Sequence, residues 1–267
     1  MSIKSILRRI KQEYEGATRT ATFKGKSYAN GNKAKEALIR SQRLINYIHE
    51  FIKKEFVNNK INPEKIFPPL GSSTPEIKIK GFLKAKNQDI SITPDYQIIR
   101  KKINDDPQIK RVITVNIRSQ LSSLNKNIDT LYERTFAEAL NLHLQYPKQC
   151  LGEVYLIPTH EYDDKAMLHN QVVFKNLSRI EDYIRMFQVI NNRTNPNKDA
   201  YKYERICLLI ADFRKATPKI YSNKEGLIND GLVPKGTSSS LEGLTIEDFV
   251  KELLKIYSQR FNIKDLY

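Results

Sequence analysis

The sequence predicts an α/β (α+β) protein in which a mixed central β-sheet is flanked by helices. Short segments with β-type patterning recur at 77–93, 112–117, 151–157 and 204–211. A long amphipathic segment at 127–144 separates two of them and gives a βαβ-like order. With 267 residues and 40% hydrophobic residues, the chain is long and apolar enough to bury a substantial core.

The first 62 residues predict a basic helical N-terminal region. Residues 1–60 contain 14 Lys and Arg against 5 Glu and no Asp. We expect a helix over 33–56 with Asn32 as its N-cap. Its basic face is either solvated or turned toward a nucleic acid. Its apolar stripe comprises Leu38, Ile45, Ile48, Ile52 and Phe56.

A proline-rich connector at 62–75 leads into a second region, 63–267, which we expect to form one compact domain with the first. The pattern predicts a strand at 77–85, a turn at 86–88, and a strand at 90–93 that Asp89 introduces. A polar loop to residue 111, a strand at 112–117, the helix at 127–144 and a strand at 151–157 follow.

The last third of the chain also alternates between predicted helices and strands. Residues 177–190 are expected to be helical, 191–198 a loop and 204–211 a strand. The Gly-, Ser- and Asn-rich stretch 222–243 predicts irregular structure. Thr245 and Asp248 form a capping-box variant before a helix at 246–260.

Composition narrows the function classes. A formal charge of +15 and a pI near 9.6 favour a polyanionic partner, although solvated lysines would give the same balance. Cys150 and Cys207 lack metal-site spacing, which indicates buried thiols and fits a reducing cytoplasm. No secretory signal or membrane-spanning run is found, so no membrane partner is expected. No glycine-rich phosphate loop occurs among the 10 glycines, which argues against a nucleotide-binding fold.

A polar cluster follows the strand at 112–117. Hydroxyl, amide and amino groups at one strand end suit phosphates and base edges. The cluster comprises Ser119, Gln120, Ser122, Ser123, Asn125, Lys126 and Asn127.

Carboxylates near the same strand end are candidates for Mg²⁺. Asp89 is the first and Asp95 the second, although each taken by itself is more often an ordinary turn aspartate than a metal ligand. Asn116 and Arg118 share one strand face because neighbours two apart point the same way. On the following helix, Glu133 and Glu138 are further candidates, and Arg134 lies four residues before Glu138; these residues otherwise form a charged surface.

The segments QDISI, VNIRSQLSSLNKNIDTLYERTFAEALNLHLQYP and LGEVYLIP, within residues 77–160, resemble the core of certain type II restriction endonucleases of the PD-(D/E)xK nuclease superfamily. The resemblance implies a restriction-endonuclease-like core and Mg²⁺-dependent hydrolysis that leaves 5′-phosphates, with Mn²⁺ as a substitute. It also implies a homodimer on palindromic double-stranded DNA.

The first acid of that superfamily falls on Asp89, with Asp95 as the fallback. Its Glu-x-Lys pair falls on Asn116 and Arg118, which depart from the pattern. Some relatives move the missing carboxylate to the adjacent helix, which makes Glu133 or Glu138 the candidate.

The resulting hypothesis is a sequence-specific DNA endonuclease in which Asp89 and a helix glutamate, Glu133, bind Mg²⁺. Arg118 would stabilise charge on the scissile phosphate. DNA contacts are expected from the polar cluster and Arg134. A non-cleaving DNA-binding protein with the same fold is the alternative. An RNA-processing enzyme is a third possibility, for which the 14 scattered tyrosines give little support.

Overall fold

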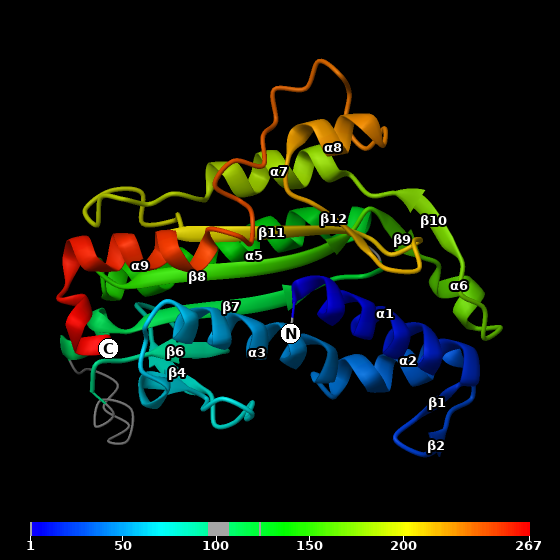
Figure 1. Ribbon diagram of the computed structural model, residues 1–267, viewed down its shortest axis with the longest axis horizontal. Helices are drawn as coiled ribbons and strands as arrows, with labels where there is room; N and C mark the ends of the chain where they lie inside the picture. The colour runs from blue at the N-terminus through cyan, green and yellow to red at the C-terminus, as the bar shows by residue number, and fades with distance from the viewer. Residues whose placement is uncertain (1, 96–106, 123) are drawn as a thin grey trace.

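A six-stranded mixed sheet forms the centre of the molecule in the computed structural model, which describes residues 2–95, 107–122 and 124–267 (Figure 1). The strand order is β12-β11-β8-β7-β6-β3, and the three middle strands β7, β8 and β11 run parallel. Strands β12, β6 and β3 pair antiparallel. The strands span Ile66–Phe67 (β3), Ile90–Ile92 (β6), Ile113–Ser119 (β7), Cys150–Pro158 (β8), Arg205–Asp212 (β11) and Lys219–Tyr221 (β12).

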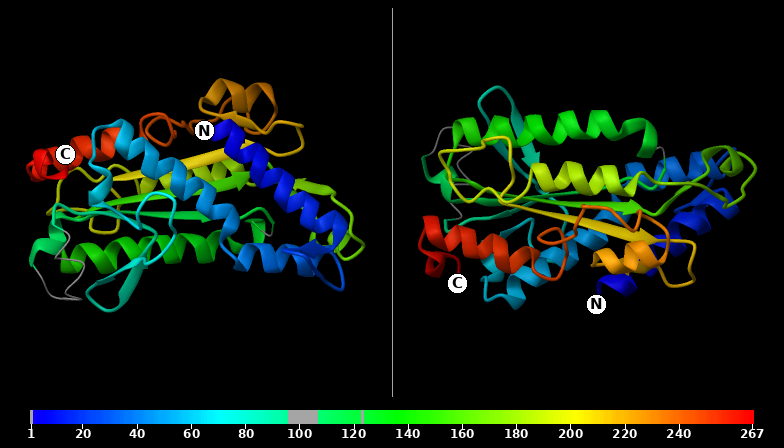
Figure 2. Two further views of the ribbon diagram at one scale, coloured as in Figure 1. Left: turned by 60° about the horizontal axis from the view of Figure 1, so that its bottom comes forward. Right: turned by 90° about the horizontal axis from the view of Figure 1, so that it is seen from above.

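Helices cover both faces of this sheet, so the predicted mixed sheet flanked by helices is confirmed (Figure 2). One face packs against α1 (Ile3–Thr20), α3 (Arg43–Asn58) and α9 (Phe249–Arg260). The other packs against α5 (Leu124–Gln145) and α7 (Ile180–Val189). The other α-helices of the described residues are α2 (Gly31–Arg40), α6 (Asp164–Met167) and α8 (Lys224–Asn229).

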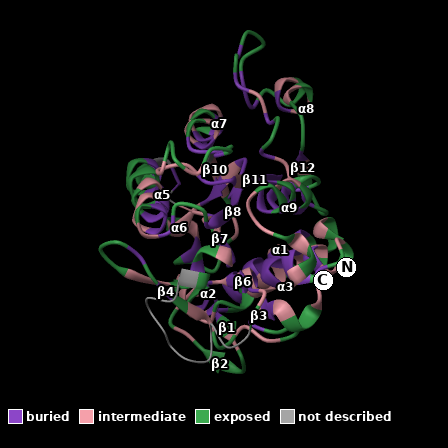
Figure 3. Ribbon diagram, turned by 90° about the vertical axis from the view of Figure 1, so that its left-hand side faces the viewer, coloured by how far each residue is buried: buried purple, intermediate pink, exposed green. Residues whose placement is uncertain are grey.

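The alternation of side chains along β7 divides the strand between two environments. Ile113, Val115 and Ile117 belong to the apolar layer shared with α3 and α9. The opposite positions, including Asn116 and Arg118, therefore face α5. Both layers are buried, as the purple sheet in Figure 3 shows.

In the described residues, three two-stranded antiparallel sheets and three short 3₁₀ turns lie around this core. Two of these sheets are hairpins, β1 (Thr22–Phe23) with β2 (Lys26–Ser27) and β4 (Ile77–Lys80) with β5 (Ala85–Gln88). In the third, helix α6 separates β9 (His160–Tyr162) from β10 (Phe174–Leu177). The 3₁₀ turns span Pro63–Lys65, Pro107–Arg111 and Ile263–Leu266.

The N-terminal region differs from the expectation in three ways. Helix α1 was not predicted as a separate element, although its apolar side packs into the same hydrophobic core as one face of the sheet. The helix expected at 33–56 is two helices, because Gln42 adopts a left-handed backbone with φ of 58°. The cap is Asn30, whose side chain accepts from the Lys33 N–H, and Asn32 lies inside α2.

Other boundaries also shift. The hairpin turn lies between β4 and β5 at 81–84, not at 86–88, and the connector 62–75 contains the edge strand β3. Helix α8 lies within the stretch expected to be irregular. Helix α9 begins at Phe249, and the Asp248 side chain makes no capping hydrogen bond, so the capping box is wrong.

A buried ionic network closes the end of the sheet where β8 and β11 begin. Glu204 accepts from Arg193 Nη1 at 3.0 Å, Arg260 Nη1 at 2.8 Å and the Leu151 N–H at 2.7 Å. Burial opposes ionisation, but His143, Arg260 and the Leu151 N–H together lower the pKa of Glu204 to about 2. The network joins α9 and the loop containing Arg193 to the sheet.

Both cysteines are free and buried, as the sequence predicted. Among the helices that the structure describes, none combines the length and apolar character needed to cross a bilayer.

Candidate functional site

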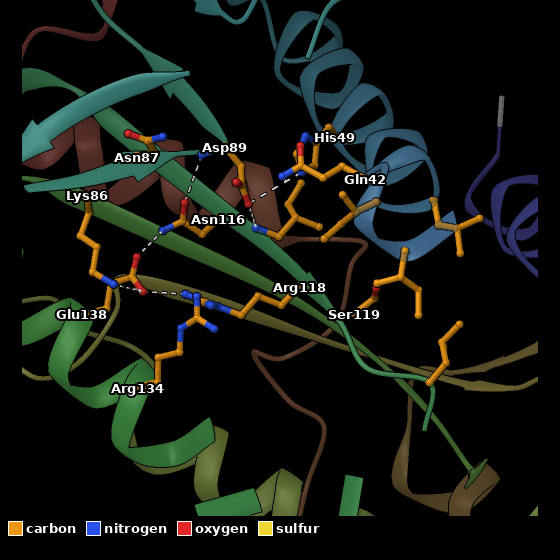
Figure 4. Close-up of a pocket in the computed structure, with 15 residues that line it drawn as sticks. Gln42, His49, Lys86, Asn87, Asp89, Asn116, Arg118, Ser119, Arg134 and Glu138 are labelled. Carbon is orange, nitrogen blue, oxygen red and sulfur yellow. Dashed lines mark hydrogen bonds and ion pairs between the residues drawn. The ribbon is translucent and has the colours of Figure 1, made fainter. Parts of the chain in front are cut away.

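A pocket of about 410 Å³ opens where β6 begins and β7 ends, beneath α5 and beside α3. Four of the predicted catalytic residues, Asp89, Asn116, Arg118 and Glu138, line it together (Figure 4). Asn116 and Arg118 come from β7, Glu138 comes from α5, and Asp89 is the single residue between β5 and β6. Their convergence follows from the β6–β7 pairing and from the way α5 crosses over β7 on its way to β8.

Asp89 is fixed by reciprocal hydrogen bonds to β7. Its Oδ2 accepts from the Ile117 N–H at 2.6 Å, and its own N–H donates to Asn116 Oδ1 at 3.1 Å. Burial raises the pKa of this carboxyl to about 6. The hydrogen bond from Ile117 lowers the pKa, and the negative charges of Glu76 and Glu138 raise it. An ionised Asp89 is therefore costly here, and a nearby cation would relieve that cost.

Asn116 links Asp89 to the helix. While its Oδ1 accepts from Asp89, its Nδ2 donates to Glu138 Oε1 at 3.1 Å and to Gln88 Oε1 at 3.2 Å. A carboxylate at this position would have no proton to donate and would repel Glu138. The amide at 116 and the glutamate at 138 thus fit each other.

Arg118 holds two acids in different directions. Its Nη2 donates to Glu138 Oε2 at 2.6 Å, and its Nε donates to Glu153 on the neighbouring strand β8. Burial disfavours the guanidinium charge, but Glu153 and Glu138 raise the pKa of Arg118 above its usual value. Burial also raises the pKa of Glu153 to about 7, opposed by Arg118. Glu153 Oε2 has no hydrogen-bond partner within the described part of the chain.

Two further groups complete the pocket. Lys86 on β5 places Nζ 3.6 Å from Glu138 Oε2. His49 on α3 places Nε2 3.7 Å from Asp89 Oδ2. Burial and the positive charge of Lys53 lower the pKa of His49 to about 4, so at neutral pH the pocket contains a neutral imidazole beside the carboxylate. Arg134 is exposed and lines the mouth of the pocket.

The pocket offers a few oxygen ligands, which are the kind of ligand that a hard divalent cation prefers. Across residues 2–95, 107–122 and 124–267, no three His, Cys, Asp or Glu side chains come together as a ready metal site. Mg²⁺, however, is often held by one or two carboxylates together with water and substrate phosphate. Asp89 and Glu138 would be those carboxylates, and the raised pKa of Asp89 is the feature that a cation would reverse.

The remaining candidates lie elsewhere. Asp95 is exposed beyond the other end of β6, and Glu133 is exposed on α5; neither lines this pocket. Of the two helix glutamates, Glu138 is thus the one beside Asp89, whereas the sequence-based choice for the metal was Glu133.

The polar cluster is divided among different environments. Ser119 lines both the first pocket and an adjoining one. Gln120 lines the adjoining pocket, where its Oε1 accepts from the Tyr155 hydroxyl at 3.1 Å. Ser122 interacts with Tyr14 of α1. Lys126 is exposed in the first turn of α5, which also contains Asn125 and Asn127, and Ser123 lies outside the described residues.

Sequence reasoning did not identify His49, Lys86 or Glu153. His49 lies on the apolar side of its helix next to Ile48, where a histidine is usually a core residue. Glu153 does carry a signal, since it is the only charged position in the strand CLGEVYLIP. Its neighbour across the sheet is Asn116.

Comparison of the chain with known protein families, with curated proteins and with solved structures finds no match. Functional inference for this chain therefore depends on the pocket itself.

Proposed function

We propose that this protein is a Mg²⁺-dependent endonuclease that hydrolyses phosphodiester bonds in double-stranded DNA. The observation that supports it best is the meeting of Asp89, Asn116, Arg118 and Glu138 in one pocket. At this strand end the restriction-nuclease pattern has a Glu-x-Lys pair. Here Arg118 takes the place of the lysine, and its carboxylate partner, Glu138, comes from the helix. The basic charge of +15 is in accord with a polyanionic substrate.

Bound Mg²⁺ would neutralise the scissile phosphate and activate a water molecule. Asp89 and Glu138 would be the residues that hold it. Arg118 orients Glu138 through its 2.6 Å hydrogen bond and contributes positive charge next to the developing phosphorane. Lys86 contributes a second cation on the other side of Glu138.

The resemblance adds finer features to this proposal. The protein would act as a type II restriction enzyme, cut a defined sequence, leave 5′-phosphates and work as a homodimer on palindromic DNA. Sedimentation of the protein with and without a duplex tests the homodimer.

The decisive experiment digests plasmid DNA with purified protein. Cleavage is expected with Mg²⁺ or Mn²⁺, should stop in EDTA and should return with excess Mg²⁺. Sequencing the ends then tests site specificity and the 5′-phosphate. Full activity in EDTA would exclude a metal-dependent nuclease.

A non-cleaving DNA-binding protein is the second candidate. It is favoured by one observation: both oxygens of Glu138 already accept hydrogen bonds, from Asn116 and Arg118. That candidate predicts tight duplex binding and intact plasmid under every metal condition.

A further inference from the structure

The hairpin formed by β4 and β5 carries two large apolar side chains at its tip. Phe82 is 59% exposed and Leu83 is 86% exposed, which makes Leu83 the most exposed large apolar residue in the described part of the chain. Isolated exposed apolar residues are common, but two in succession at a loop tip indicate a contact with another molecule.

The tip is held rigidly on α5 by one side chain. Asn141 Oδ1 accepts from the N–H groups of Leu83 and Lys84 at 2.8 and 3.0 Å, and its Nδ2 donates to the Lys84 carbonyl at 2.8 Å. The Phe82 N–H donates to the Asn141 carbonyl at 2.8 Å.

Gly81 makes this close approach possible. A Cβ at that position would lie 2.0 Å from Asn141 Nδ2 and 2.8 Å from the Asn141 carbonyl oxygen. The backbone of the tip is thus fixed before any partner binds, while the side chains of Phe82 and Leu83 remain in solvent.

The same hairpin is strongly basic. The segment 77–88 contains four lysines and no acidic residue. Lys78, Lys80 and Lys84 are exposed, and Lys86 lines the pocket. A positively charged hairpin with an apolar tip complements double-stranded DNA. The phosphate backbones of the duplex are negatively charged, and the stacked base pairs between them offer apolar faces.

The tip also lies close to the proposed active site. Strand β5 ends at Gln88, and Asp89, which Figure 4 labels in the pocket, follows directly. Lys86 lies three positions after Leu83, which is about 10 Å of extended chain. This corresponds to roughly three base-pair steps along a duplex at about 3.4 Å per step.

We propose that Phe82 and Leu83 form a wedge that inserts between base pairs of double-stranded DNA from the minor groove and unwinds the duplex beside the scissile phosphate. Phe and Leu are side chains that proteins use in this way, and the inserted residue partly unstacks the bases and kinks the helix. This inference rests on the proposed function, because it describes how the proposed nuclease would contact its DNA substrate.

Unwinding can be measured without cleavage. Closed circular plasmid is relaxed in EDTA by a metal-independent topoisomerase in the presence of increasing protein, and the topoisomers are then resolved on a gel. The wild type should shift the topoisomer distribution in proportion to bound protein. The variant F82A/L83A should leave the distribution unchanged at equal DNA occupancy. Equal shifts from both proteins, or no shift from the wild type, would overturn the proposal.

A matched control removes two exposed apolar side chains elsewhere. Leu168 and Val189 are 49% and 54% exposed, on the loop after α6 and on α7. L168A/V189A should behave as the wild type. F82A/L83A should also lower affinity for a duplex by about 5- to 100-fold, the effect of losing one base-stacking contact.

The outcomes separate this proposal from the nuclease proposal. Unwinding without any Mg²⁺-dependent cleavage would reject the nuclease and keep the wedge. Cleavage with equal unwinding by F82A/L83A would do the reverse. If F82A/L83A instead abolishes self-association and leaves the topoisomers unaffected, the tip is a protein–protein contact and the wedge is wrong.

Discussion

Arg118 donates from Nη2 to Oε2 of Glu138 over 2.6 Å and so joins the end of a strand to a helix residue twenty positions later. The same guanidinium reaches Glu153 through Nε. A lysine offers a single point charge, whereas the planar fork of arginine can serve two acids in fixed directions. Arginine at position 118 therefore suits a pocket whose carboxylate comes from the helix.

Replacing Asp89 with Asn should abolish cleavage, by about a thousandfold or more if metal binding is lost, while DNA binding remains. The fold should persist because the Asn oxygen can still accept from the Ile117 N–H. Asp95→Asn is the matched control, since Asp95 is exposed at the other end of β6. Plasmid cleavage and gel shift on both variants test this, and a normal rate for Asp89→Asn would remove it from the mechanism.

Glu138→Gln should reduce cleavage strongly, whereas Glu133→Gln should cut at a rate close to the wild type. The two residues lie on the same helix, but only Glu138 faces Asn116 and Arg118. Circular dichroism of both variants checks that helix and sheet are intact. The opposite ranking of rates would restore Glu133 as the metal-binding residue.

Cleavage should fall as the pH drops through about 6, because burial raises the pKa of Asp89 to about 6 and only the ionised carboxylate binds a cation. Raising the Mg²⁺ concentration should move this acid limb to lower pH, since metal and proton compete for one group. Rates measured from pH 5 to 8 at two Mg²⁺ concentrations give the result. An acid limb that does not respond to Mg²⁺ would assign the titration to another group.

Arg134→Ala should weaken binding to all duplexes alike and reduce the slope of log affinity against log salt by about 0.9, the effect of one lost phosphate contact. Arg134 is exposed and lines both adjoining pockets. Lys165→Ala, an exposed cation on α6, is the control and should leave the slope unchanged. Equal slopes for the wild type and Arg134→Ala would place the phosphates elsewhere.

Glu204→Gln should lower the free energy of unfolding by about 3–5 kcal/mol, because Arg193 and Arg260 would keep buried charges without their partner. Since the folded pKa of Glu204 is lowered to about 2, its stabilisation is fully present above about pH 4.5 and is lost as the pH falls toward 2. Urea unfolding at pH 7 and pH 3 measures both effects. Glu225→Gln, exposed on α8, should change little.

The elements with strong periodicity were predictable, and the strands β7, β8 and β11 and the helix α5 lie within a few residues of their expected positions. The spacing of Asn116 and Arg118 on one strand face also follows from the sequence alone. The choice between Glu133 and Glu138 does not, because it depends on which face α5 turns toward the sheet.

The basic face of the N-terminal helices illustrates a second limit of sequence reasoning. Lys35 pairs with Asp164 at 2.8 Å, and Arg43 pairs with Glu13 at 2.7 Å. Lys53 is buried and donates to the Ser72 carbonyl at 2.7 Å. Each of these partners is 19 or more positions away from its cation, so a charge count along the helix could not reveal that internal contacts use these cations.

Gln88 and Asp89 are consecutive, and Asn116 contacts both: its Nδ2 donates to the Gln88 side chain and its Oδ1 accepts from the Asp89 N–H. The hairpin is thus tied down at both ends, by Asn141 at its tip and by Asn116 at its base. Two asparagine side chains therefore hold the backbone that leads into Asp89 in one position before any ligand arrives.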